Sequence, residues 1–360
     1  MKIKVLTVVG ARPQFVKAGA LSRAFEKNDQ IEEVIVHTGQ HFDENMSDVF
    51  FEEMNIRKPK HNLHINSLDH GAMTGRMLEG VEEIIKIEKP DLLLVYGDTN
   101  STLAGALAAK KLHVKVAHVE AGLRSFNMEM PEEVNRILTD RISDYLFCPT
   151  DTAIENLEKE GYDNIACDIV KSGDVMQDAA LFYAQKSAEK STIISELELE
   201  KFCLVTLHRA ENTNDPEKLK DIVTALNHIH ANIIPIVLPL HPRTEGKLKD
   251  IDLELKVKTI APVGYFDMIE LIKNSRLVMT DSGGLQKEAF FFKKYCITMR
   301  EQTEWVELIA EKVNVLVGSD RAKIVEAVEL MLDKESDFEK NLYGNGKACD
   351  NIIKHILQHH

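Results

Sequence analysis

The sequence predicts an α/β protein built from two doubly wound parallel sheets, and three observations support this. Apolar runs such as Leu92 to Tyr96 are nearly continuous, which is typical of a parallel strand buried on both faces. Helical patterns alternate with these runs along the chain, which favours right-handed crossovers between strands of one sheet. Glycine and polar residues follow most runs, at the strand ends where ligands bind in such folds.

Composition narrows the function classes. The length of 360 residues suggests two domains. The net charge of −14 argues against a general nucleic-acid binder, because phosphate backbones attract basic surfaces. No apolar run approaches the roughly 20 residues needed to cross a bilayer, and the N-terminus shows no signal-peptide pattern. The five cysteines form no Cys-x-x-Cys pair, so we expect reduced thiols and a cytoplasmic protein.

The first half is expected to carry six strands with helices between them. The expected strands are residues 3–9, 31–36, 92–96, 114–119, 145–148 and 169–173. The expected helices follow Gly10 or span 70–87, 102–111, 131 onward, 151–161 and 174–190. Pro13 and Pro131 suit the first turn of a helix, and Pro90 ends one.

The second half repeats this rhythm. The expected strands are residues 202–207, 233–238, 257–260, 276–279, 295–298 and 314–317, and the main helices end near 230 or span 266–273, 285–291 and 351–357. We expect domains at 1–172 and 173–345, although no Gly/Ser linker marks the boundary. The last helix could pack on either half, and we assign 346–360 to the first domain.

Charged and polar residues gather where the expected strands of the first half end. Arg12, His41, Asp98 and Glu120 all fall at such ends, and Lys17 lies one turn into the first helix. Because these strand ends share one edge of the sheet, the residues are candidates for a ligand site. The alternative for each is an ordinary exposed charge.

The segment from Thr280 to Glu288 predicts a strand, a tight turn and a helix N-terminus. The first amides of a helix lack internal partners and form the positive end of the helix dipole. Gly283 and Gly284 would let the backbone approach an anion closely, which makes this turn a candidate phosphate site. The alternative is an ordinary helix with Ser282 as its cap.

The helix beginning at Pro131 allows a plain interpretation. Glu132 and Arg136 are four residues apart and share a helix face. On local grounds a surface ion pair is the favoured interpretation, and it contributes only a few tenths of a kcal/mol.

Six motifs, in order along the chain, resemble those of the non-hydrolysing UDP-N-acetylglucosamine 2-epimerases. They are Gly10-Ala11-Arg12-Pro13, Gly97-Asp98-Thr99-Asn100-Ser101-Thr102, Val119-Glu120-Ala121-Gly122-Leu123-Arg124, Pro131-Glu132-Glu133-Val134-Asn135-Arg136, Asp281-Ser282-Gly283-Gly284-Leu285-Gln286-Lys287-Glu288 and Arg300-Glu301-Gln302-Thr303-Glu304. The resemblance implies two Rossmann-like domains facing a cleft in a glycosyltransferase-B-like fold. It also implies a UDP-HexNAc substrate, no metal or redox cofactor, and a homodimer.

The resemblance assigns roles to individual residues. Asp98, Glu120 and Glu132 match the catalytic carboxylates, and His208 matches the histidine near the leaving phosphate. The implied substrate-binding residues are Arg12, Lys17, His41, Arg136, His241, Ser282, Gly283, Gly284, Glu288 and Arg300. Among these, the Ser282 turn would hold the diphosphate, Glu288 the ribose and Arg300 the nucleotide.

The implied reaction inverts C2 of the sugar. That C–H bond is not adjacent to a carbonyl, so the bond from C1 to UDP is expected to break first and acidify C2. Loss of the C2 proton gives a glycal and UDP. Reprotonation from the other face and re-addition of UDP complete the inversion, which needs acids and bases near C2. Which carboxylate is acid and which is base stays open.

Two further features leave the details open. The loop with Gln40 and His41 resembles an allosteric UDP-N-acetylglucosamine site in some bacterial members, but its other residues do not map clearly. Trp305-Val306 stands where many members have Arg-Pro, and this form resembles epimerases of modified sugars such as diacetamido-uronic acids. The substituents at C3 and C6 are therefore not fixed.

Three alternatives remain at this point. A retaining glycosyltransferase or a hydrolysing 2-epimerase would share the fold, but the first has no need of carboxylates around C2. A non-catalytic nucleotide-sugar sensor would keep the Ser282 turn, and it would not need Asp98, Glu120, Glu132 and His208 together.

Overall fold

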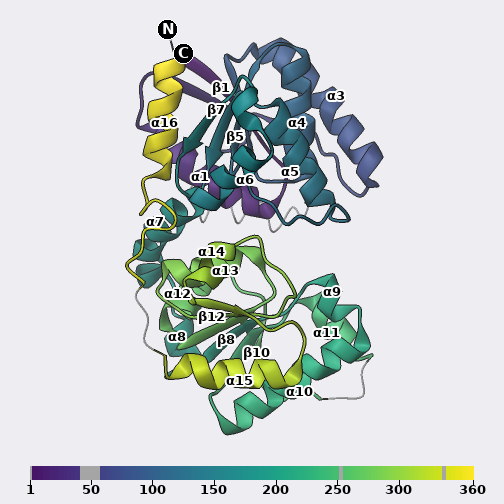
Figure 1. The fold of residues 1–360 in the computed structure, drawn as a ribbon, viewed down its shortest axis with the longest axis vertical. Coiled ribbons are helices and arrows are strands. Elements are labelled where there is room, and N and C mark those ends of the chain that lie inside the picture. The colour runs from purple at the N-terminus through teal and green to yellow at the C-terminus, as the bar shows by residue number, and fades with distance from the viewer. Residues whose placement is uncertain (1, 41–56, 251–253, 335–337) are drawn as a thin grey trace. The chain divides into compact units, whose positions relative to one another are not determined.

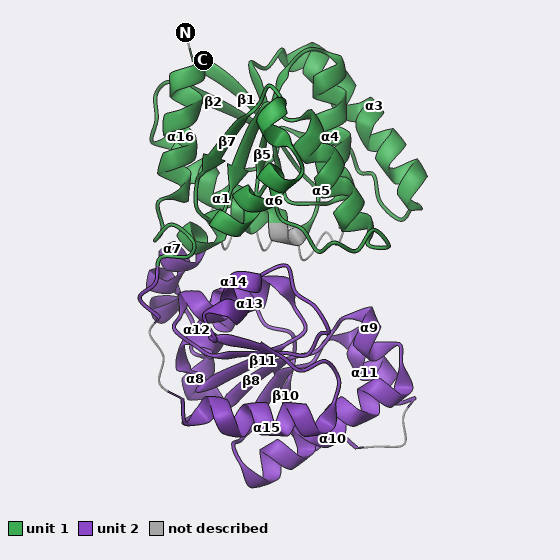
Figure 2. Cartoon of the chain, viewed as in Figure 1, with its two compact units in different colours: residues 1–179, 341–360 green, residues 180–340 purple. Residues whose placement is uncertain are grey.

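The computed structural model describes residues 2–40, 57–250, 254–334 and 338–360, and nothing of the side chains at positions 12 and 13. Spatial contacts divide the chain into two units, residues 1–179 with 341–360 and residues 180–340 (Figure 2). Helix α7 (Val175–Lys190) runs from the first unit into the second. The domain boundary expected between residues 172 and 173 stays a prediction.

Unit 1 contains a fully parallel sheet of seven described strands in the order β3-β2-β1-β4-β5-β6-β7. The strands are β1 (Ile3–Val9), β2 (Ile31–His37), β3 (His61–Asn62), β4 (Leu92–Tyr96), β5 (Lys115–Val119), β6 (Tyr145–Cys148) and β7 (Asp168–Lys171). The strand order reverses between β1 and β4. In doubly wound sheets a crevice for ligands opens at this reversal.

Helices cover both faces of this sheet. They are α1 (Arg12–Glu26), α3 (His70–Glu88), α4 (Asn100–Lys111), α5 (Pro131–Ile142), α6 (Asp151–Lys159) and α16 (Ala348–His359). Successive strand side chains point to opposite faces. Leu93 and Val95 of β4 therefore pack in one apolar cluster with Val81 of α3 and Ala106 of α4. On α1, Phe15 and Leu21 are buried, and α1 contacts α16 (Figure 1).

Unit 2 repeats the arrangement, and its described residues form six parallel strands in the order β10-β9-β8-β11-β12-β13. The strands are β8 (Cys203–Thr206), β9 (Ile236–Pro239), β10 (Lys258–Ile260), β11 (Leu277–Thr280), β12 (Cys296–Thr298) and β13 (Asn314–Leu316). The helices are α8 (Ile193–Glu196), α9 (Ala210–Thr213), α10 (Pro216–Asn232), α11 (Pro242–Leu248), α12 (Tyr265–Asn274), α13 (Gly283–Phe291), α14 (Val306–Ala310) and α15 (Arg321–Leu332). The order reverses between β8 and β11.

The core of unit 2 consists of two layers, one on each face of the sheet. Val205 of β8 belongs to a cluster with α10 and α15. Its neighbour Leu204 belongs to a cluster with α8, α12 and α13. This alternation confirms the predicted α/β class with two doubly wound parallel sheets.

No helix in the described part of the chain is both long enough and apolar enough to cross a membrane.

Glu88, the last residue of α3, joins three elements of unit 1. Its carboxylate lies 2.7 Å from the amino groups of Lys4 and Lys60 and 2.7 Å from Nε2 of His61. The side chain is only 4% exposed. Hydrogen bonds from Lys4, Lys60 and His61 lower the pKa of Glu88 to about 2.

We expect Glu88→Gln to lower the free energy of unfolding at pH 7 by about 2 kcal/mol, the scale of a hydrogen bond to a charged group. The pKa of Glu88 is lower in the folded chain than in the unfolded chain. Its contribution is therefore complete above pH 4.5, the ordinary pKa of the group, and is lost as the pH falls toward 2. Urea unfolding at several pH values measures this. Glu82→Gln, in an exposed pair on the same helix, is the control and should change stability little.

Candidate active site

Gln14 ties together the two loops at the strand reversal of unit 1. Its Oε1 accepts hydrogen bonds from the amides of Gly10 at 2.8 Å and Ala11 at 3.0 Å. Its Nε2 donates to the carbonyl of Tyr96 at 2.8 Å. The loop after β1 is thereby held against the loop that carries Asp98. The backbone of Arg12 begins α1, but its side chain and all of His41 lie outside the described residues.

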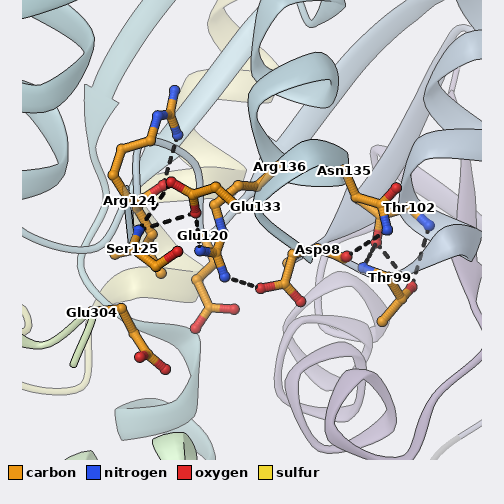
Figure 3. Close-up of polar contacts among 12 residues, drawn as sticks. Asp98, Thr99, Thr102, Glu120, Arg124, Ser125, Glu133, Asn135, Arg136 and Glu304 are labelled. Carbon is orange, nitrogen blue, oxygen red and sulfur yellow. Dashed lines mark hydrogen bonds and ion pairs between the residues drawn. The ribbon is translucent and has the colours of Figure 1, made fainter. Parts of the chain in front are cut away.

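Asp98 is held by α5. The guanidinium of Arg136 forms ion pairs with the carboxylates of Asp98 and Glu133 (Figure 3). Nδ2 of Asn135 donates to the backbone carbonyl of Asp98 at 3.0 Å. Arg136 is 6% exposed, whereas the side chain of Asp98 is 31% exposed. The arrangement fixes one carboxylate oxygen of Asp98 and leaves the group accessible to a ligand.

Glu120 follows β5 in a strained backbone conformation. Its φ of +72° lies in the left-handed region, which costs a non-glycine residue of order 1–3 kcal/mol. Its carboxylate forms an ion pair with Lys17 of α1. A Cβ built on Gly97 would lie 3.3 Å from Oε2 of Glu120, so this carboxylate sits against the residue that precedes Asp98. Figure 3 shows Asp98, Glu120 and Arg136 gathered in one region of unit 1.

The two neighbouring glutamates of α5 differ in environment. Glu132 is exposed. Glu133 is buried and accepts hydrogen bonds from the amides of Ser125 at 3.0 Å and Phe126 at 2.8 Å. Burial raises the pKa of Glu133, but these amides and the Arg136 charge outweigh burial and hold that pKa below its ordinary value.

The surface ion pair between Glu132 and Arg136 suggested by the helix spacing is therefore wrong. Among the described residues, Arg136 pairs with Asp98 and Glu133 instead. Residues one apart on a helix point in directions about 100° apart, so the inward position falls to Glu133.

A buried network of hydrogen bonds holds the two acidic loops, which are the loop with Asp98 after β4 and the loop with Glu120 after β5. His118 Nδ1 lies 2.7 Å from Asp140 Oδ1, and its Nε2 lies 2.7 Å from the carbonyl of Gly97. Asp140 also accepts from the amide of Gly122 at 3.1 Å and from Arg124 at 2.7 Å. Each ring nitrogen of His118 therefore has an oxygen acceptor within hydrogen-bond distance, and the ring is fixed between Asp140 and Gly97.

The network thus fixes the residue before Asp98 and the second residue after Glu120. Burial raises the pKa of Asp140, but hydrogen bonds and charges from His118 and Arg124 hold it below its ordinary value. All three side chains are 0% exposed.

In unit 2, His208 and Asp281 meet at the strand reversal between β8 and β11. The carboxylate of Asp281 is fully buried and accepts from the amides of His208 at 3.0 Å and Arg209 at 2.9 Å. Nδ1 of His208 lies 3.2 Å from Oδ1 of Asp281, and the ring is 47% exposed. A carboxylate at Nδ1 orients the ring and leaves Nε2 for a ligand.

The N-terminus of α13 adjoins this pair. Ser282 is the cap residue, and its amide donates to Oγ1 of Thr280 at 2.9 Å. A Cβ at Gly283 would come within 2.5 Å of Oε1 of Glu304, and Arg300 Nη1 lies 3.0 Å from Oε2 of Glu304. The helix end and the Arg300 guanidinium therefore lie close together, a combination that suits a phosphate.

Deeper in α13, two charged residues are buried. Glu288 is 7% exposed and accepts from the hydroxyl of Tyr265 at 3.1 Å. The amino group of Lys287 lies 3.9 Å from the ring centroid of Trp305.

His241 is exposed and caps the short helix α11 by accepting from the amide of Arg243 at 3.2 Å.

Each unit therefore assembles part of the predicted set. Unit 1 brings together Asp98, Glu120, Lys17 and Arg136, whereas unit 2 brings together His208, Ser282, Gly283 and Arg300. Sequence reasoning missed the supporting residues, which are His118, Glu133, Asp140 and Asp281. Only Glu133 and Asp281 lie in quoted motifs, and nothing local marks His118 or Asp140.

The family model described as UDP-N-acetylglucosamine 2-epimerase matches residues 23–357. A Pseudomonas aeruginosa UDP-2,3-diacetamido-2,3-dideoxy-D-glucuronate 2-epimerase is 57% identical over 99% of this chain and 100% of its own length. The crystal structure of Methanocaldococcus jannaschii UDP-GlcNAc 2-epimerase with UDP-GlcNAc and UDP is similar with a TM-score of 0.89 and 43% identity, covering 99% of this chain and 100% of the other. A Neisseria meningitidis UDP-GlcNAc 2-epimerase bound to UDP-GlcNAc also has a TM-score of 0.89, at 30% identity, and the match covers 99% of this chain and 100% of the other.

Proposed function

Because the chain belongs to the UDP-N-acetylglucosamine 2-epimerase family, we propose that it inverts C2 of UDP-2,3-diacetamido-2,3-dideoxy-D-glucuronate. The observation that carries this substrate is the 57% identity, over full length, to a relative named for that reaction. The M. jannaschii UDP-N-acetylglucosamine 2-epimerase is less similar, at the 43% identity given above. The predicted family and the predicted glycosyltransferase-B-like α/β class are confirmed.

The proposed chemistry is elimination followed by addition. The bond between C1 and the UDP oxygen breaks, a carboxylate removes the C2 proton, and a 2-acetamidoglycal and UDP form. An acid then protonates C2 from the other face, UDP adds back to C1, and no water is consumed. We propose Asp98, Glu120 and Glu132 for the acid–base steps, and the accessible Asp98 carboxylate beside Glu120 supports two of them.

The diphosphate chemistry is proposed for unit 2. The leaving UDP carries growing negative charge, which helix amides and an arginine stabilise. We propose that Ser282, Gly283, Gly284 and Arg300 hold the diphosphate and that His208 donates to it through Nε2. Support comes from the Asp281 carboxylate at the other ring nitrogen. Arg12, Lys17, His41, Arg136, His241 and Glu288 complete the proposed binding set.

Proton NMR in deuterated water tests both reaction and substrate. With UDP-2,3-diacetamido-2,3-dideoxy-D-glucuronate we expect the C2 proton signal to disappear and the signals of the 2-epimer to grow. UDP should not accumulate in proportion to product. Stoichiometric UDP with free sugar would indicate a hydrolysing enzyme, and binding without exchange would indicate a sensor.

UDP-N-acetylglucosamine is the second candidate substrate, because solved relatives bind it. The same experiment with this sugar should give slower exchange if the uronate is the true substrate. Faster exchange with UDP-N-acetylglucosamine would overturn the uronate assignment and leave the family assignment intact.

Three further proposals follow from the family resemblance. We propose a homodimer, a cytoplasmic location and turnover that needs no metal or redox cofactor. Light scattering of the purified chain measures its oligomeric state. Turnover after treatment with EDTA tests whether a metal is needed, and we expect the rate to be unchanged.

A further inference from the structure

Three potential metal ligands meet at the end of the unit 1 sheet where the strands begin, whereas Asp98 and Glu120 lie at the end where the strands finish. Asp168 is the first residue of β7, whereas the acidic loops follow the last residues of their strands. His355 and His359 are four residues apart on α16 and therefore share a helix face. One potential ligand atom from each of the three residues lies within 4.8 Å of the other two.

The separations fit a tetrahedral transition-metal site. Oδ2 of Asp168 lies 3.2 Å from Nε2 of His355 and 3.7 Å from Nδ1 of His359. Zinc binds such atoms at roughly 2.0–2.1 Å, which places neighbouring tetrahedral ligand atoms about 3.3 Å apart. The separation between Asp168 and His355 already fits this value. The His359 ring is 44% exposed, and its rotation can shorten the separation between Asp168 and His359.

The cluster is more than an ion pair at a helix end. Nε2 of His355 is inaccessible to solvent and faces Oδ2 of Asp168 at 3.2 Å. The rings of His355 and His359 stack with centroids 4.3 Å apart, which keeps both imidazoles beside the Asp168 carboxylate. Neutral imidazoles with one carboxylate form a donor set that suits zinc.

The ring of His355 is also held in place. It packs edge-on against Tyr145 and Phe147 of β6, with centroids at 5.1 and 5.6 Å. An imidazole fixed in this way loses little rotamer entropy on binding an ion, so the site is partly preorganised.

We propose that Asp168, His355 and His359 bind one transition-metal ion of the zinc type, with water in the remaining position. The ion joins α16 to the start of β7 and so fastens the C-terminal helix to unit 1. The site is structural, and the proposal does not depend on which sugar the enzyme uses.

The test is titration of the metal-stripped full chain with zinc chloride, followed by isothermal calorimetry. We expect one principal site, and Asp168→Asn, His355→Gln and His359→Gln should each weaken it by at least about tenfold. His359 is partly exposed, so its variant folds even if the other two do not. His228→Gln, an exposed histidine on α10, is the matched control and should bind like the wild type.

Two further measurements complete the test. Cobalt chloride should give the intense visible absorption of a tetrahedral site in the wild type and the control, but not in the three variants. Zinc should raise the melting temperature of the wild type and the control only. Equal binding by wild type and all three variants, or no binding by the wild type, overturns the proposal. Turnover with and without zinc should be equal, which separates this result from the fate of the proposed function.

Discussion

Asp98→Asn is expected to lower the rate of C2 proton exchange by about a thousandfold, while the dissociation constant for UDP changes little. A positioned acid or base contributes roughly 10²–10⁴-fold to such a rate. An amide cannot take or give the proton, yet it has nearly the same shape. Arg136 keeps Glu133 as a partner in the variant, so no buried guanidinium loses all its counter-charge.

Exchange is measured by NMR in deuterated water, and UDP affinity by calorimetry. The matched control is Asp151→Asn, which removes an exposed aspartate paired with Lys171 at the start of α6. It should leave both quantities unchanged. If Asp98→Asn exchanges like the wild type, Asp98 is not an acid or base. If exchange and UDP affinity fall together, Asp98 supports the fold.

The sheet is the part of this protein that its sequence predicts well. Leu92 to Tyr96 is expected and observed with the same bounds, because a strand buried on both faces must be apolar at every position. β3 was not predicted, since it is two residues long and consists of His61 and Asn62. A strand that short takes its conformation from the strand it pairs with.

Several helices of unit 2 were also missed. Helix α15, Arg321–Leu332, buries Ile324 and Val328 against the sheet, and these residues do show helical spacing. Asp320 caps it by accepting from two amides at 2.9 and 3.0 Å. The sequence thus contains the apolar spacing and the N-cap residue that predict α15, whereas it contains no comparable pattern for β3.

The candidate site shows where local reasoning ends. The position of Asp98 follows from chain order, because a residue just after a parallel strand must lie at the ligand-binding edge. The choice of Glu133 as the inward-facing acid depends on amides at 125 and 126, in a loop whose course no periodicity predicts. His118 lies inside an apolar strand, and only the fold brings it to Asp140 on the next helix.

Asp140→Asn is expected to lower the free energy of unfolding by about 3–5 kcal/mol, the range for breaking a buried charge pair. The loss leaves His118 and Arg124 without their shared carboxylate. Either orientation of the new amide also directs its N–H groups at a donor. Because marginal stability is only about 5–15 kcal/mol, this is a large fraction of the total.

Glu160→Gln provides the matched control, since it removes the other partner of the same guanidinium. Arg124 binds Glu160 through Nε and Nη2 at 2.7 and 2.8 Å, but Glu160 is 32% exposed and water can replace it. We expect a loss of about 1 kcal/mol or less from this variant. Urea unfolding measures the free energy of unfolding of both variants. Equal losses of this free energy would show that burial of Asp140 does not strengthen its contribution to stability.

The pH dependence gives an independent check on the sign of this effect. The pKa of Asp140 is lower in the folded chain than the 3.8 typical of an unfolded aspartate, so the folded state binds fewer protons in this range. The stabilisation from the carboxylate is therefore complete above pH 3.8 and decreases as the pH falls below it. The gap in stability between wild type and Asp140→Asn should narrow over the same range. A gap that widened toward acid would mean that the buried carboxylate takes up a proton more readily in the folded chain than in the unfolded chain, which is the opposite of the direction expected from its contacts with His118 and Arg124.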